Sequence, residues 1–321
     1  MKRRAVLRGA APVVNFLLLV WMVSVAVFLL LELIPGDPVD SLVPPGASEE
    51  MRELARQNYG LDEPLLQRYA SWMGGVLQGD FGRSFTTQTD VLASIAERAP
   101  VSLELAVVSM LLALAVSVPV GVWSAYRPGG HVDRIATTLT SATLAVPSFV
   151  LGILLVFVFG VQFGMLPILG WVPFSEDPVD HVRHLALPVL TLAAGECVLF
   201  TRLLKGDMTA TLQQDHVLSA RARGLPTWRI LVRHALRQSS FSLVTVSGVV
   251  IGRLIGGTVI VELIFSLPGM GTLVVNSILS RDFVVVQAVV LLSALLYLSI
   301  NTIVDLVYPW LDPRVRKVSA A

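Results

Sequence analysis

The charged residues that interrupt long apolar runs are the first candidates for chemistry in this chain. Glu196 lies in an apolar run at about 187–205, and Arg253 lies in another at about 240–262. A lone charge inside hydrocarbon is costly, so such residues pair, face water or serve a site. If both runs are antiparallel helices across a membrane, a rise of 1.5 Å per residue places both side chains roughly 14 to 15 Å from the outer surface. We therefore expect a Glu196–Arg253 salt bridge beside a polar path; the alternative is that each faces an aqueous cavity unpaired.

Other polar and small residues lie at informative places in the apolar runs. Glu104, Glu262 and Asp305 lie nearer the run ends, where a carboxylate can reach headgroups or water. Residues four apart share one face of a helix, and small ones allow a neighbouring helix to come close. The run that holds Arg253 carries such a ridge: Gly248, Gly252 and Gly256.

Motifs for catalysis and nucleotide binding are missing from the sequence. A Walker A loop needs Gly-Lys-Ser/Thr, whereas the lysines of this chain follow Met1, Leu204 and Arg316. HExxH, GxSxG and CxxC are absent too. One polar stretch has spacings compatible with a metal site: Asp177, Asp180, His181 and His184. We interpret it as a solvated loop, and we expect all five histidines of the chain to lie in loops. We expect no catalytic residue, no metal site and no ATP site in this chain.

The composition indicates a polytopic membrane protein. Hydrophobic residues make up 54% of the 321 residues and charged residues only 15%, and the mean hydropathy is +0.73. In soluble domains, hydrophobic residues average roughly 45–50% and charged residues about 25%. The net charge of +1 gives no sign of nucleic-acid binding, and the single cysteine, Cys197, is interpreted as a small buried hydrophobe.

Six apolar runs are long enough to cross a bilayer as helices. They are Val13–Leu33 and the runs at about 101–125, 135–162, 187–205, 240–262 and 284–308. Residues 1–34 then form a cytoplasmic N-terminus and first span, 35–99 an outer region with short helices near 51–59 and 63–77, and 100–321 a five-helix core. With both termini inside, most basic residues lie on the cytoplasmic side, as the positive-inside rule requires. Those left outside are Arg52, Arg56, Arg68, Arg83, Arg98, Arg183 and Arg281.

Asp215–Gln238 is the long basic segment between two apolar runs. Its arginines at 229, 233 and 237 recur every four residues, which makes one cationic stripe on a helix. Its apolar residues are expected to turn the other way: Trp228, Leu231, Val232 and Ala235. Gly224 favours the end of one helix, and Pro226 suits the first turn of the next. The pattern predicts a helix, a short turn and a second helix at the inner membrane face.

Several short motifs resemble those of one family of bacterial membrane proteins. The segments Ala-Arg-Ala-Arg-Gly (220–224) and Arg-His-Ala-Leu-Arg (233–237) resemble the cytoplasmic "EAA" loop of ABC importer permeases. Family-like strings also occur, in the family's order, at 34–38, 59–65, 67–69, 79–84, 265–271, 281–283 with Gln287, and 311–314 with Asn301, Asp305 and Tyr308. The closest resemblance is to the B-type permease of peptide (dipeptide/oligopeptide) importers. The chain departs from this family at 238–242, where Gln-Ser-Ser-Phe-Ser replaces an apolar stretch with a proline.

The resemblance implies a fold, a set of partners and a site. The fold is the all-α type I importer permease fold with six transmembrane helices in the bacterial cytoplasmic membrane. The partners are a homologous C-type permease, two ATPase subunits or a fused pair that bind ATP and Mg²⁺, an extracytoplasmic substrate-binding protein and membrane lipid. The loop at 206–238 would dock on an ATPase through the following residues: Ala220, Arg221, Ala222, Arg223, Gly224, Arg229, Arg233 and His234. Independently of the resemblance, the charges within the apolar runs make Glu196, Arg253 and Glu262 candidates for the translocation path or for buried charges.

Alternative functions remain open at this stage. Related permeases of the same family carry nickel chelates or glutathione, and the basic loop by itself also fits contact with anionic lipid. A proton-driven secondary transporter or an intramembrane hydrolase belongs to a different class. The hydrolase needs a Ser–His, paired-Asp or zinc arrangement within the spans, and the sequence offers none.

Overall fold

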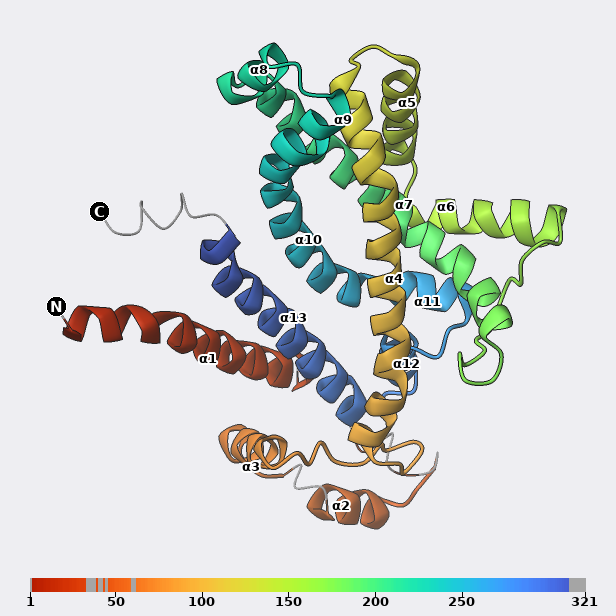
Figure 1. The fold of residues 1–321 in the computed structure, drawn as a ribbon. Helices are drawn as coiled ribbons and strands as arrows, with labels where there is room; N and C mark the ends of the chain where they lie inside the picture. Colours follow the sequence, from red (N-terminus) through yellow and green to blue (C-terminus); the bar gives the residue numbers. More distant parts are fainter. Residues whose placement is uncertain (1, 33–38, 40–42, 44–45, 59–61, 312–321) are drawn as a thin grey trace. The chain divides into compact units, whose positions relative to one another are not determined.

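The computed structural model describes residues 2–32, 39, 43, 46–58 and 62–311. Some of the motif residues lie outside the described part: 34–38, 59–61 and 312–314. The side chains of Asp305 and Tyr308 lie outside it too. The described chain consists of helices and loops, and its one β feature is an isolated bridge between Arg83 and Asp90. Figure 1 shows the helices, which run in chain order as α1 Lys2–Glu32, α2 Glu49–Asn58, α3 Leu65–Leu77, α4 Val91–Tyr126, α5 His131–Ala145, α6 Ser148–Leu155, η2 Val156–Gln162, α7 Pro178–Leu212, α8 Asp215–Ala222, α9 Thr227–Arg229, η3 Ile230–Leu236, α10 Arg237–Gly257, α11 Val259–Phe265, α12 Met270–Leu279 and α13 Phe283–Leu311.

Four stretches of helix are long and apolar enough to cross a membrane. They are Val91–Tyr126, Pro178–Leu212, Thr227–Gly257 and Phe283–Val304, and each contains or overlaps a predicted span. Two broken helix pairs meet the same criteria, which brings the number to as many as six. In α1 the apolar stretch of the described residues is Val14–Leu29. The prediction of an all-α polytopic membrane protein is confirmed.

The span predicted at 135–162 is not one straight helix. α5 ends at Ala145 and α6 begins at Ser148, and the two segments are bent by 106°. Pro147 explains the break, because proline lacks an N–H and disfavours helical backbone in the residue before it. Val146 accordingly has extended backbone, with φ −111° and ψ 124°.

The span predicted at 240–262 is also divided. α10 ends at Gly257, after two adjacent glycines of low helix propensity, and α11 begins at Val259. α11 ends where Ser266 adopts left-handed backbone with φ 53°. The motif at 265–271 therefore forms the break between α11 and α12, which together make the second broken pair.

By packing, the chain forms two compact units that are discontinuous in sequence. One comprises Met1–Ser102 with Pro268–Ser299, and the other comprises Leu103–Leu267 with Ile300–Ala321. α4 and α13 each contribute to both. The outer region at 35–99 thus shares a compact unit with α12 and the first part of α13.

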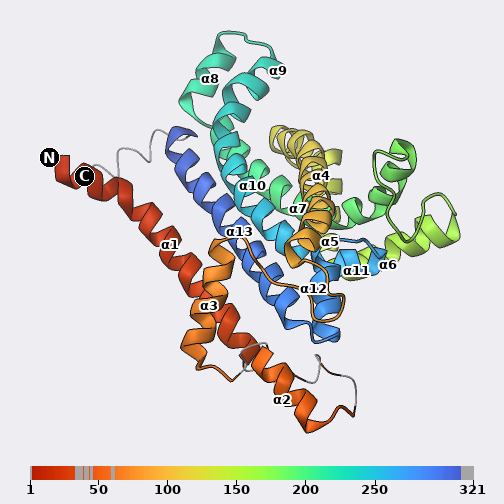
Figure 2. The ribbon, with the colours of Figure 1, turned by 90° about the horizontal axis from the view of Figure 1, so that it is seen from below.

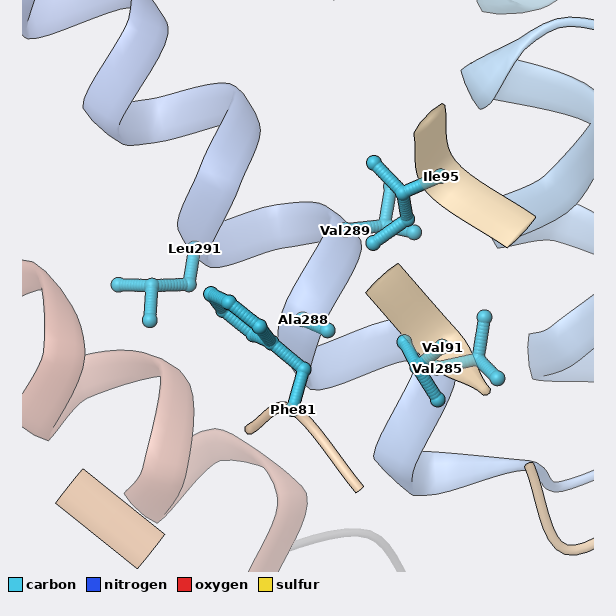
Figure 3. Packing of buried hydrophobic residues seen from close by; sticks show 7 residues of the cluster. All are labelled: Phe81, Val91, Ile95, Val285, Ala288, Val289 and Leu291. Atoms are coloured by element: carbon cyan, nitrogen blue, oxygen red, sulfur yellow. The ribbon is translucent and has the colours of Figure 1, made fainter. Parts of the chain in front are cut away.

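The core of the first unit joins two motifs that lie far apart in the sequence. Phe81, from the motif at 79–84, and Val91 and Ile95 of α4 form one buried cluster with residues of α13, among them Val285 and Leu291 (Figure 3). Beside this core, buried Asp282 accepts hydrogen bonds from Ser84 Oγ at 2.5 Å and from Thr86 Oγ1 at 3.0 Å. Both motifs that carry the family resemblance in this region therefore have a structural role.

α3 packs across α1 through aromatic side chains (Figure 2). The ring of Phe28 lies edge-on to that of Tyr69, with centroids 5.4 Å apart, and Trp72 lies 5.9 Å from Phe28. The Tyr69 hydroxyl and Ser24 Oγ are hydrogen-bonded at 2.8 Å. Both helices predicted in the outer region are present, as α2 and α3.

α7 is the central helix of the second unit. α5, α6, α10 and α11 all pack against it, and its fully buried side chains include Phe200, Leu204 and Met208. Figures 1 and 2 show the turn between α8 and α9 at the end of α10 that is farther from α11. The second unit therefore carries both the charged residues of the spans and the basic turn.

Candidate functional site

The ion pair expected between α7 and α10 is present. Nη2 of Arg253 lies 2.9 Å from Oε1 and 2.8 Å from Oε2 of Glu196. Because α7 and α10 pack against each other, two residues at matching depth can meet. The sequence could predict this contact because it shows both the opposite charges of the two residues and their similar distances from the ends of their apolar runs.

The two partners differ in burial, which the sequence did not reveal. The Glu196 side chain is 10% exposed, whereas that of Arg253 is 61% exposed. Arg253 lies near the end of the stretch Thr227–Gly257, and a guanidinium within an apolar helix is costly to expose to lipid. The face of α10 that carries Arg253 therefore needs water or another protein beside it.

Glu262 does not reach water or headgroups, and that expectation is wrong. Its residue is 0% exposed, and Thr258 Oγ1 donates a hydrogen bond to its Oε1 at 2.6 Å. The break between α10 and α11 explains this, because Thr258 lies just before α11 and its hydroxyl reaches the first turn of that helix. Glu262 is thus a buried structural carboxylate in this structure.

The three glycines of α10 meet different surroundings. A Cβ on Gly248 would lie 2.2 Å from Cγ2 of Val304, so the Val304 side chain occupies the space that a side chain at position 248 would need. Gly252 is buried. Gly256 has nothing within 4 Å of an added Cβ and is exposed.

The polar stretch at the start of α7 is ordered and partly buried, contrary to the expectation of a solvated loop. Asp177 caps α7 by accepting hydrogen bonds from the amides of Val179 and Asp180. His181 is 2% exposed, with Nδ1 2.7 Å from the Val172 carbonyl oxygen and Nε2 2.8 Å from Glu104 Oε1. All five histidines lie in helices rather than in loops. No group of three or more His, Cys, Asp or Glu within the described residues is arranged to hold a metal.

The basic segment forms the predicted helix, turn and helix. α8 ends at Ala222, and Gly224 has φ +71°, the left-handed conformation that favours glycine. Its amide donates to the Arg221 carbonyl at 2.9 Å, and the Leu225 amide donates to Ala220 at 3.3 Å. Pro226 precedes the next helix as its N-cap, one residue earlier than predicted.

Most of the predicted coupling residues lie on the surface of this turn. The exposed ones are Arg221, Ala222, Arg223, Gly224, Arg229 and Arg233. His234 is half-buried, and Ala220 is completely buried. Ala220 can position the turn but cannot itself touch a partner in this arrangement.

The second helix of the segment has a π-helical stretch that changes which residues face inward. η3 covers Ile230–Leu236, where hydrogen bonds skip five residues instead of four. Leu231 and Ala235 are buried as predicted, but Trp228 and Val232 are 63% and 54% exposed. Val232 lies within the wider turn of η3, whereas Trp228 precedes it in α9.

An ion pair that the sequence analysis missed joins α5 to α7. Lys205 Nζ donates to Asp133 Oδ1, while Oδ2 of Asp133 accepts from the Gly129 amide at 2.9 Å. Both charged residues flank apolar runs, so their positions were visible. Their pairing was not, because it depends on how α5 packs against α7.

Apolar helices of this number and length, with charges paired inside them and a basic turn at one end, define a multi-pass membrane subunit. Residues 117–317 match the family described as "Binding-protein-dependent transport system inner membrane component", and residues 3–106 match "Binding-prot-dependent transport system membrane comp, N-term". The chain belongs to this family of inner membrane components of binding-protein-dependent transport systems.

Similarity to individual proteins extends over nearly the whole chain. The probable peptide ABC transporter permease protein y4tP of Sinorhizobium fredii is 37% identical over 295 residues, which is 92% of this chain and 94% of that protein. The oligopeptide transport system permease protein AppB of Bacillus subtilis is 36% identical over 91% of this chain and 94% of its own length. The glutathione transport system permease protein GsiC of Escherichia coli is 35% identical over 92% of this chain and 94% of its own length.

Proposed function

We propose that this chain is one channel-forming permease subunit of an ATP-driven peptide importer in the bacterial cytoplasmic membrane. The observation that carries the proposal is end-to-end similarity to permeases named for peptide transport, at 36–37% identity over more than nine-tenths of the chain. The Gly224 turn, a surface loop rich in arginine, supports it. The chain has no Walker A motif, so ATP and Mg²⁺ belong to partner subunits.

The proposed assembly has four kinds of component. This chain pairs with a homologous C-type permease, the pair binds two ATPase subunits or a fused pair, and an extracytoplasmic binding protein delivers the substrate. Both termini lie in the cytoplasm. The loop at 206–238 rests on an ATPase through the exposed arginines of α8, α9 and η3.

Packing offers a route from this loop to the spans. α8 packs against η3 and α7, and η3 continues directly into α10. A displacement of the turn when the ATPases close therefore moves the helices that carry Glu196 and Arg253. With Arg253 exposed on α10, this pair borders the water-filled path between the two permeases, and the cavity alternates between inward- and outward-facing.

A test is uptake of radiolabelled dialanine by proteoliposomes that contain this permease and its four partners. ATP-dependent uptake that requires the binding protein supports the proposal. Uptake that persists without ATP and collapses with an uncoupler would instead show a proton-driven secondary transporter.

Glutathione is the second candidate substrate, because GsiC is nearly as similar as the peptide permeases. Competition between labelled dialanine and excess glutathione separates the two, since the preferred substrate suppresses uptake of the other. A nickel chelate added in the same assay tests the remaining alternative of this family.

A further inference from the structure

A cavity of about 600 Å³ opens between the end of α7 and the start of α10. One wall is the end of α7, with Asp207, and Gln214 between α7 and α8; the other is η3 and the beginning of α10, with Arg233 and Arg237. The volume lies within the range of roughly 300–1,000 Å³ that small-molecule sites occupy. This cavity is separate from the Glu196–Arg253 pair, neither member of which lines it, but it adjoins the proposed ATPase-docking surface, since Arg233 and His234 belong to both.

Two hydrogen bonds join residues of the two walls of the cavity. Gln238 Nε2 donates to Gln214 Oε1 at 3.0 Å, and Ser239 Oγ donates to Thr211 Oγ1 at 3.0 Å. Ser239 and Thr211 are 3% and 4% exposed. These side chains already have partners, so the uncompensated groups of the cavity are its charged ones.

The charges that line the cavity have no partners in the described part of the chain. Oδ2 of Asp207 is shielded from solvent and has no hydrogen-bond partner there. Neither Arg233 nor Arg237 forms an ion pair with it, although all three residues line the same space. Asp207 is half-buried, and its shielded oxygen is costly to leave without a donor, while the exposed Arg233 and Arg237 on the facing wall can attract an anion.

We propose that this cavity binds a small zwitterion, with its ammonium group against Asp207 and its carboxylate or phosphate against Arg233 and Arg237. A simple anion would leave the negative charge of Asp207 without a partner, and a simple cation would leave the positive charges of Arg233 and Arg237 without one. Two sources share this chemistry: a free short peptide, and the phosphoethanolamine headgroup of a lipid. Either ligand would tie the end of α7 to the start of α10, across the helices that the basic turn connects.

The experiment measures binding to the complete transporter, in phosphatidylcholine nanodiscs without nucleotide. The probes are dialanine and glycerophosphoethanolamine. Their matched controls are N-acetyl-dialanine, which lacks the ammonium, and glycerophosphocholine, whose quaternary ammonium cannot donate a hydrogen bond. Isothermal titration gives each Kd, and whichever probe binds identifies the source.

We expect Asp207→Asn to weaken binding of the zwitterion by about tenfold or more, because a charge-assisted hydrogen bond is lost. Arg237→Gln should weaken it similarly from the anionic side, and it carries the test if Asp207→Asn fails to assemble. Asp215→Asn makes the same chemical change on α8, outside the cavity, and should leave binding unchanged.

Three results overturn the inference: neither probe binds, both variants bind as wild type does, or the control probes bind as well as those whose ammonium group can donate a hydrogen bond. Dialanine held elsewhere in the transporter is recognised by its insensitivity to both variants. Because binding is measured without ATP or transport, its failure is distinct from failure of ATP-dependent uptake, which tests the proposed function.

Discussion

At the scale of single residues, the Glu196–Arg253 pair shows both the reach and the limit of reading the sequence. Counting residues from the ends of two apolar runs placed both side chains at the same depth, and the structure joins them. The count could not show that Arg253 is exposed, because exposure depends on which helices cover α10. For the same reason Glu262 was misplaced: its burial follows from the break at Thr258, which a run of apolar letters conceals.

Charge exchange tests whether the pair matters for assembly. Glu196→Arg and Arg253→Glu should each reduce the amount of assembled transporter and its uptake, since each places like charges together. Breaking a fully buried pair costs about 3–5 kcal/mol, and the exposure of Arg253 puts this pair below that range. The double exchange should recover part of the loss. A double variant no better than the worse single variant contradicts a direct interaction.

At the scale of elements, helical periodicity located nearly every helix but not the departures from regular geometry. Proline and paired glycines mark the breaks after Ala145 and Gly257, and both signals were present in the sequence. The π-helical stretch at 230–236 has no comparable signal. It was therefore missed, and with it the exposure of Val232, which lies inside this stretch.

The turn at Gly224 is the element whose disturbance should separate ATP hydrolysis from transport. A residue with a side chain costs roughly 1–2 kcal/mol in left-handed backbone, and the open space beside Gly224 would be filled by an indole. Gly224→Trp should assemble normally but lose substrate-stimulated ATPase activity and uptake. Gly224→Asn, which tolerates this backbone, should retain most of both. Wild-type activity in the tryptophan variant would argue against coupling through this turn.

The approach of α10 to Val304 makes a second prediction about elements. A methyl group on Gly248 collides with Val304, and overpacking of this kind costs typically about 1–3 kcal/mol. Gly248→Ala should therefore lower the thermal unfolding temperature of the purified transporter, and adding Val304→Ala should restore it. Gly256→Ala is the matched control, expected to be neutral or stabilising because its Cβ meets nothing. Equal effects at both glycines would contradict a close contact at Gly248.

At the scale of the whole molecule, composition and order of motifs were enough to predict an all-α membrane protein of this family. They were not enough to predict the compact units, since a division at 35 and 100 follows the chain whereas packing brings 79–84 together with 281–291. Packing between segments that lie far apart in the chain leaves no pattern in the sequence of either segment. The hydrogen bond between Glu104 and His181 and the ion pair between Asp133 and Lys205 escaped prediction for the same reason.

The orientation of the chain in the membrane is a separate prediction at this scale. Ser48 is exposed and belongs to the region expected outside. In a Cys197→Ala background, Ser48→Cys should react with a membrane-impermeant maleimide in intact spheroplasts. A cysteine at Ser219, exposed on α8, serves as the inside control and should react only after the membrane is opened. The reverse pattern would invert the topology.

The link between Ser84 and Asp282, residues 198 positions apart, has a consequence for biosynthesis. A ribosome releases the outer region long before it has made α13, so Phe81, Val91 and Ile95 wait for most of translation without the residues that cover them. The first unit can close only when the last helix emerges, and the nascent chain must be protected until then from pairing with other exposed apolar surfaces. Truncation anywhere before α13 therefore removes more than a terminal helix: it leaves the amino-terminal third of the protein without its core.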